Sequence, residues 1–155
     1  MPNTKLRPIL ALRLTLAPAR QVRSASSEVR MLYDIRGGRF EGSGLSGRIM
    51  PVIGDWVIVK GREITIDVRI RLQTDDGHDI HLSYDKIGDL DPEMRRLADA
   101  HPDVDKSKHF FTFRPLLETK SDQLAWLTRM DIVALGIRFD EAIEYVLYGD
   151  RPPEA

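Results

Sequence analysis

The sequence predicts an all-β fold, a small antiparallel β-barrel of about nine or ten strands with one short inserted helix. Hydrophobic and polar residues alternate along most of the chain, which is the pattern of strands with one buried face. Glycines separate the alternating segments, as is typical of turns between antiparallel strands. A barrel is favoured over a sandwich because closing the sheet leaves no exposed edge strand.

The longest predicted strand is Glu63–Thr74. Its apolar side chains share one face and its polar side chains the other, with Ile64, Ile66, Val68, Ile70 and Leu72 on the apolar face. The sequence Thr-Asp-Asp-Gly at 74–77 separates it from a second alternating segment at 79–85. Because Asp-Gly between two such segments is a strong hairpin signal, residues 63–85 are predicted to form a β-hairpin.

The remaining elements are shorter. Strands are predicted at 9–16, 29–35, 38–42, 47–52, 55–60, 110–113, 124–139 and 142–147, with a loose connection at 17–27. Residues 91–100 have the signals of a short helix, because Asp91 is a suitable N-cap, Pro92 occupies the first helical position and Pro102 follows the end. We expect one β-barrel domain over residues 1–155, with a loose C-terminal tail at 151–155.

The composition excludes several classes of protein. None of the 155 residues is cysteine, which excludes disulfide scaffolds, zinc–thiolate sites, iron–sulfur clusters and thiol nucleophiles. Lys and Arg number 23 against 24 Asp and Glu, whereas proteins that bind nucleic acid usually carry a basic excess. No apolar run is long enough for a membrane span, and the N-terminus lacks a secretory signal. We therefore expect a cytoplasmic protein that binds neither nucleic acid nor membranes.

The sequence also predicts neither a cofactor nor a metal ion. The glycines at 42, 44 and 47 are spaced as in a phosphate-binding loop, but no Gly-Lys-Ser/Thr follows them. His78 and His81 lie close to Asp75 and Asp76, but turn formation already explains the Asp-Asp-Gly sequence. Histidines three residues apart on a strand point to opposite faces and cannot share a metal ion.

Several segments in a fixed order resemble one known family. They are the run 42–51, Gly54-Asp55-Trp56, the segment 67–77, Pro115-Leu116-Leu117-Glu118-Thr119, Ala125-Trp126-Leu127 and Gly136. Together they resemble the domain-of-unknown-function 3237 family of small bacterial and fungal β-barrel proteins, over about residues 10–147. The resemblance implies a barrel and points to cofactor-free chemistry on aromatic metabolites, such as decarboxylation or ring opening of lignin-derived phenols, or cyclisation of polyketide products.

Asp131 is the first candidate catalytic residue. It lies in the otherwise apolar run 130–135, which is predicted to be a strand. A carboxylate on a barrel wall is costly unless it is paired, so Asp131 is either a general acid or base with a raised pKa or a structural residue. The structural alternatives are a salt bridge to Arg129 or a neighbouring strand, and exposure at an edge.

Asp67 and Arg69 form a second candidate group, because they lie two residues apart on one face of the longest strand. If that face lines the barrel interior, Arg69 anchors a carboxylate or phenolate and Asp67 orients the guanidinium. If the face meets solvent, both are ordinary surface residues. Alternation alone slightly favours the solvent-facing alternative, whereas the resemblance gives the two alternatives nearly equal weight, since the family pattern retains both residues.

Five further residues complete the candidate site. Trp56 and Trp126 either form an aromatic wall for a planar ligand or are large core residues. Asp55 and Glu118 are candidate proton carriers, although Glu118 has the alternative of accepting hydrogen bonds in a turn. Tyr84 shares an apolar strand face with Ile80 and Leu82, and it is predicted to donate a hydrogen bond to a developing oxyanion.

These residues favour a barrel that binds a mostly apolar, aromatic or phenolic small molecule. The predicted activity is that of a cofactor-free lyase, decarboxylase or cyclase, and the alternative is a non-catalytic carrier or sensor of an apolar small molecule. We also expect a homo-oligomer, most simply a dimer, because the segments 132–139 and 142–148 are apolar on both faces.

Overall fold

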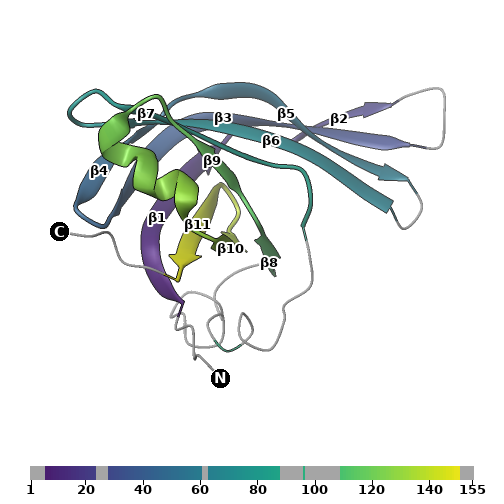
Figure 1. Cartoon of the computed structure of the whole chain (residues 1–155). Coiled ribbons are helices and arrows are strands. Elements are labelled where there is room, and N and C mark those ends of the chain that lie inside the picture. The colour runs from purple at the N-terminus through teal and green to yellow at the C-terminus, as the bar shows by residue number, and fades with distance from the viewer. Residues whose placement is uncertain (1–5, 24–27, 61–62, 88–95, 97–108, 151–155) are drawn as a thin grey trace.

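The computed structural model describes residues 6–23, 28–60, 63–87, 96 and 109–150. The predicted tail at 151–155 lies outside these residues, as does the predicted helix at 91–100 apart from Arg96. All described strands belong to one antiparallel sheet (Figure 1). They are β1 (Arg7–Leu16), β2 (Arg20–Arg23), β3 (Val29–Gly42), β4 (Leu45–Ile49), β5 (Val52–Lys60), β6 (Glu63–Thr74), β7 (Asp79–Tyr84), β8 (His109–Phe113), β9 (Leu116–Glu118), β10 (Ile132–Arg138) and β11 (Ala142–Gly149). The predicted all-β barrel is confirmed.

The chain itself closes the barrel between β8 and β9. The strands follow the order β8-β10-β11-β1-β3-β4-β6-β7-β9, so β8 and β9 stand at the two ends of the series. Only Arg114 and Pro115 separate these two strands in the sequence, and β8 pairs with β10 while β9 pairs with β7. One stretch of chain therefore joins both ends of the sheet. Pro115 has no N–H to donate to a ladder, which is consistent with the break between the two strands.

Strand β3 changes partners half-way along its length. Its second half pairs with β1 and β4, whereas residues 29–33 pair with β2 and β5. Gly37, with φ of 131°, lies near the change, where a residue with a side chain is strained. The ends of β2, β3, β5 and β6 project beyond the barrel as a twisted extension (Figure 1). The loose connection predicted at 17–27 is thus wrong at Arg20–Arg23, which form the edge strand β2.

A 3₁₀ helix, η2 (Asp122–Arg129), replaces the first part of the strand predicted at 124–139. Its buried residues Leu124 and Leu127 are three positions apart, and three residues make one turn of a 3₁₀ helix. The acidic Asp122 in the first turn and the basic Arg129 in the last also suit a helix dipole. The sequence prediction followed the apolar residues and overlooked this spacing.

Side chains fill part of the barrel interior. Large side chains pack in one cluster with Leu124 and Leu127 of η2, including Ile9, Phe40, Ile49, Leu72 and Ile80. The predicted apolar face of β6 contributes Ile66, Val68, Ile70 and Leu72 to this core. Other inward-facing side chains leave a cavity between them.

Two turns that contain glycine join neighbouring strands. Gly42 pairs with Leu45 across β3 and β4, and the two residues between them, Ser43 and Gly44, have φ of 54° and 76°. Two positive φ values suit a two-residue hairpin turn of type I′. The β6–β7 hairpin is also confirmed, with Gly77 at φ of 95°. Beside that turn, hydrogen bonds from Ser46 and Arg39 lower the pKa of Asp75.

The outer faces of β10 and β11 form a second apolar cluster. Val133, Leu135, Ile137, Val146 and Tyr148 are buried there, and burial raises the pKa of the Tyr148 phenol. These side chains are already shielded from solvent within the single chain, so this face does not need a second copy to exclude water. The expected dimer thereby loses the argument on which it rested, and oligomerisation stays a prediction.

Candidate functional site

The candidate site is a cavity of about 220 Å³ in the barrel interior, at the end away from η2. It is lined mainly by apolar side chains from β1, β3, β5, β6, β7, β8 and β11, and β10 contributes Arg138. Among the described residues the lining comprises Leu14, Leu16, Tyr33, Ile35, Val57, Ile66, Val68, Tyr84, Ile87, Phe111, Arg138, Ile143 and Tyr145. The alternation of each strand explains this composition, since the inward positions carry the apolar residues.

Two tyrosines form a hydrogen-bonded pair in the cavity wall. The hydroxyls of Tyr84, on β7, and Tyr145, on β11, lie 2.6 Å apart, and both side chains are buried. Phe113 stacks on the Tyr84 ring with centroids 3.9 Å apart and meets the Tyr145 ring edge-on at 4.9 Å. Phenol hydroxyls both donate and accept hydrogen bonds, so this rigid pair can engage an oxygen atom of a ligand.

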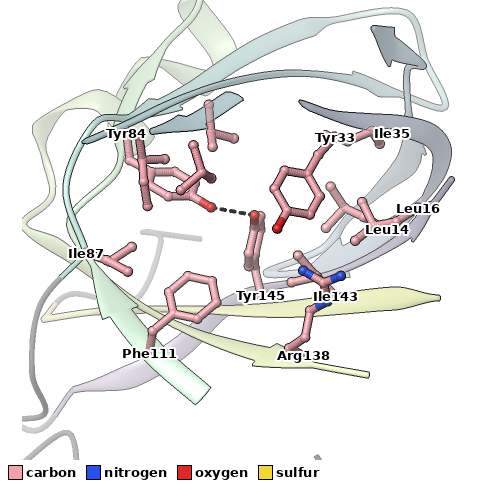
Figure 2. A pocket seen from close by; sticks show the side chains of 13 residues that line it. Leu14, Leu16, Tyr33, Ile35, Tyr84, Ile87, Phe111, Arg138, Ile143 and Tyr145 are labelled. Carbon is pink, nitrogen blue, oxygen red and sulfur yellow. Dashed lines mark hydrogen bonds between the residues drawn. The ribbon is translucent and has the colours of Figure 1, made fainter. Parts of the chain in front are cut away.

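Arg138 and Tyr33 also face the cavity. Figure 2 shows the rings of Tyr33, Tyr84 and Tyr145 pointing toward one another, and Arg138 among the side chains that line the same cavity. The Arg138 guanidinium carbon lies 5.3 Å from the centre of the Tyr33 ring, within the range of a cation–π contact. Arg138 Nε donates to the backbone carbonyl of Phe139 at 3.2 Å. The site therefore combines an apolar wall, phenol hydroxyls and one cation.

Among the three predicted catalytic residues whose side chains are described, Asp131, Glu118 and Tyr84, only Tyr84 lines the cavity. The expectation that Asp131 lies on the barrel wall is wrong, because this residue precedes β10 and its side chain is exposed. Glu118 ends β9 with an exposed side chain and pairs with His81 on the neighbouring strand. With Arg69 and His81 it borders a depression on the outside of the barrel.

Three of the predicted ligand-binding residues, Asp67, Arg69 and Trp126, lie away from the cavity. Asp67 and Arg69 lie on the outer face of β6, where Arg69 Nε donates to Asp67 Oδ1 at 3.3 Å and the Arg69 side chain is 79% exposed. The solvent-facing alternative thus holds for this pair. Trp126 lies on η2, where it is half-buried against the core at the other end of the barrel. The core alternative holds for this tryptophan.

Asp55 and Trp56 lie on β5, and their side chains are outside the described part of the structure. Their backbones pair with β3, Asp55 opposite Tyr33 and Trp56 opposite Leu32. Across the other edge of β5, Trp56 pairs with Asp67. Asp55 is thus the one predicted carboxylate whose backbone is paired with a residue of the cavity lining.

Sequence reasoning missed Tyr33, Arg138 and Tyr145, although β10 carried a usable signal. Bulky residues at 133, 135 and 137 alternate with Ile132, Ala134, Gly136 and Arg138 along this strand. Ala134 and Gly136 are small, which leaves room on the inward face for neighbouring side chains such as the Phe111 ring opposite Gly136. An arginine at the end of such a face is a candidate for ligand binding.

Gly136 leaves the room that the Phe111 ring occupies, and replacing this glycine is expected to weaken ligand binding. A Cβ atom at position 136 would lie 2.5 Å from Phe111 Cζ, so the ring must move in Gly136→Ala. Since Phe111 lines the cavity, we expect benzene to bind about tenfold more weakly, equivalent to about 1.4 kcal/mol. Titration followed by NMR measures this. The double variant G136A/F111L, which relieves the contact, should restore binding; unchanged binding in G136A would show that Phe111 does not shape the cavity.

Comparisons with known proteins agree with the fold. Residues 4–149 match the model of a family described as protein of unknown function, DUF3237. A UPF0311 protein of Rhodopseudomonas palustris is 28% identical over 116 residues, covering 74% of this chain and 76% of that protein. The crystal structure of a β-barrel-like protein from Acinetobacter baumannii is 32% identical, with a TM-score of 0.72 and 94% of each chain covered.

A more distant likeness is to a crystal structure described as an enzyme from Penicillium herquei. It is 19% identical to this chain, with a TM-score of 0.61 and 93% of each chain covered. At this identity the likeness concerns the fold alone. Among the residues that the structure describes, no helix is both long enough and apolar enough to cross a bilayer.

Proposed function

The chain belongs to the DUF3237 family, and for it we propose the binding of a compact, mostly apolar small molecule in the barrel cavity, followed by cofactor-free acid–base chemistry on that ligand. The observation that carries this proposal is the buried Tyr84–Tyr145 hydroxyl pair in a cavity that is otherwise lined mainly by apolar side chains. Ligand sites of proteins commonly combine an apolar wall with a few polar groups that orient the ligand.

The size of the cavity supports a ligand with one ring. An apolar cavity of about 150 Å³ is enough to bind benzene, whereas sites for drug-sized molecules span about 300–1,000 Å³. The volume of about 220 Å³ lies between these values. A single aromatic ring with one or two small substituents, such as a simple phenol, fits this space.

The polar groups support chemistry at an oxygen substituent of such a ring. Hydroxyl donors held in an apolar site stabilise negative charge on an oxygen more strongly than donors in water do. The stacked contact with Phe113 and the mutual hydrogen bond hold both hydroxyls in place, so little reorganisation is needed as charge develops. Tyr84 and Tyr145 would therefore stabilise a phenolate or enolate oxygen while a proton is added to or removed from carbon. Asp55 is the candidate base.

Non-catalytic carriage of the same ligand is the alternative function, and the apolar lining supports it equally. The name of the Penicillium herquei protein indicates that this fold is compatible with catalysis, although fold does not determine function. The two functions share the binding step and differ only in whether the ligand is changed.

The binding step is tested by two variants at neighbouring positions of β6. Val68 lines the cavity and Arg69 lies on the outer face, so Val68→Phe should fill the cavity while Arg69→Gln should leave it intact. We expect Val68→Phe to weaken binding of phenol and 4-hydroxybenzoate by about a hundredfold, equivalent to about 2.7 kcal/mol. Arg69→Gln should bind as the wild type does.

Isothermal titration calorimetry measures the affinities, and circular dichroism checks that both variants fold. Weaker binding in Arg69→Gln with full binding in Val68→Phe would place the site on the outside of the barrel and contradict the proposal.

A further inference from the structure

We propose that the cavity selects a ligand with a single negative charge, and that Arg138 binds a carboxylate of this ligand with both of its terminal nitrogens. The inference rests on the proposed function, because it concerns the same cavity. It adds the charge of the ligand and the residue that recognises this charge, neither of which follows from the apolar lining.

The first observation is the charge of the lining. Arg138 is the one charged residue among the described residues that line the cavity; the others are aliphatic or aromatic, with three tyrosine hydroxyls as their polar groups. A cation beside an apolar space attracts an anion strongly, because little water is present to screen the charges. Its position therefore favours ligands with one anionic group over neutral ligands of the same shape.

The second observation is the set of partners of this guanidinium. On the outer surface, Arg13, Arg20, Arg39, Arg69 and Arg71 each pair with an aspartate or glutamate. No ion pair joins Arg138 to any of the carboxylates whose side chains the structure describes. Its Nε donates to the Phe139 carbonyl, and its two terminal nitrogens have no acceptor among the described residues. Their N–H groups form the planar fork that binds a carboxylate in bidentate fashion.

The third observation is the packing of the guanidinium. The guanidinium carbon lies 5.3 Å from the centre of the Tyr33 ring. The hydrogen bond that Nε donates to the Phe139 carbonyl holds the guanidinium in place at its Nε side. These two contacts already restrict the conformations of the Arg138 side chain, so less conformational entropy is lost when a ligand binds. The terminal nitrogens are thus positioned at the cavity before the ligand arrives. Arg138 lines the same cavity as Tyr84 and Tyr145 (Figure 2), so a ligand whose carboxylate binds Arg138 has its ring in the space that the tyrosine pair faces.

The test compares pairs of ligands that have the same shape and differ in charge. The pairs are benzoate with benzamide and 4-hydroxybenzoate with 4-hydroxybenzamide, titrated calorimetrically at pH 7.5 into the full chain. We expect the wild type to prefer each carboxylate over its amide by about tenfold or more, as a charge-assisted bidentate pair implies. Arg138→Gln should bring this ratio close to one by weakening carboxylate binding and leaving amide binding unchanged.

Two further variants separate the recognition of charge from other effects. Arg138→Lys keeps the positive charge but removes the planar guanidinium donors. Its preference for the carboxylate over the amide should therefore lie between the preferences of the wild type and Arg138→Gln. Arg71→Gln removes an arginine from the outer face and should leave the ratio at the wild-type value. Circular dichroism verifies the fold of each variant.

The outcomes distinguish the failure of this inference from failure of the proposed function. If the wild type binds amides as tightly as carboxylates, or if Arg138→Gln keeps the carboxylate preference, charge selection by Arg138 is wrong while the cavity remains a binding site. If no member of either pair binds to the wild type, the proposal of a single-ring ligand fails and this inference fails with it.

Discussion

Replacing Gly38 by alanine is expected to lower the free energy of unfolding by about 3 kcal/mol or more. Gly38 pairs with Leu14 on β1 and with Ile49 on β4, at the point where β3 bends. A Cβ atom at this position would overlap the backbone carbonyl oxygen of Arg13. Because the obstacle is backbone and not the end of a flexible side chain, β1 and β3 must separate to make room.

Urea unfolding followed by tryptophan fluorescence and circular dichroism measures this loss. Gly44→Ala is the matched control, since a Cβ atom at Gly44 meets nothing within 4 Å. That substitution should cost only about 1–2 kcal/mol, which is the strain of a positive φ at a residue with a side chain. If both variants lose the same stability, the close approach of β1 and β3 is not what requires glycine at position 38.

The second large effect is expected at the tyrosine pair. If Tyr84 and Tyr145 stabilise a phenolate or enolate oxygen, the protein should accelerate the exchange of ring protons of a bound phenol for deuterium in D₂O. Removing either hydroxyl, in Tyr84→Phe or Tyr145→Phe, should slow this exchange by about a hundredfold or more. The effect on binding should be far smaller, because the aromatic surface remains.

The double variant Y84F/Y145F sharpens this test. The two hydroxyls lie 2.6 Å apart and act as one unit. The exchange rate of the double variant should therefore be well above the value obtained by multiplying the fold-decreases of the two single variants. Proton NMR of 4-hydroxybenzoate in D₂O follows the exchange. Tyr148→Phe is the control, because Tyr148 is a buried tyrosine in the cluster on the outer faces of β10 and β11. Exchange that is unaffected in the double variant would exclude catalysis by the pair, and binding without exchange in the wild type would favour the carrier.

The amino-acid sequence by itself determined the fold class and most of the strands. Alternation depends only on which neighbours along one strand are apolar, so the inward face of β6 could be assigned at Ile66, Val68, Ile70 and Leu72. Both hairpin turns were predictable for a similar reason, since Gly44 and Gly77 adopt positive φ values that few other residues tolerate. The resemblance to a family led to the same barrel.

The tertiary structure alone decided which residues meet in the cavity. Tyr84 and Tyr145 are 61 positions apart, and their hydroxyls come together only because both strands turn the same face inward across a closed barrel. Asp131 appeared to interrupt a strand, but β10 begins at Ile132, so this carboxylate never enters the barrel wall. Polarity along one strand cannot reveal such placements, because they depend on pairings between segments distant in the sequence. For this reason the predicted site included the conspicuous charges of Asp67 and Arg69 and left out Arg138, whereas the folded chain turns the first two outward and Arg138 inward.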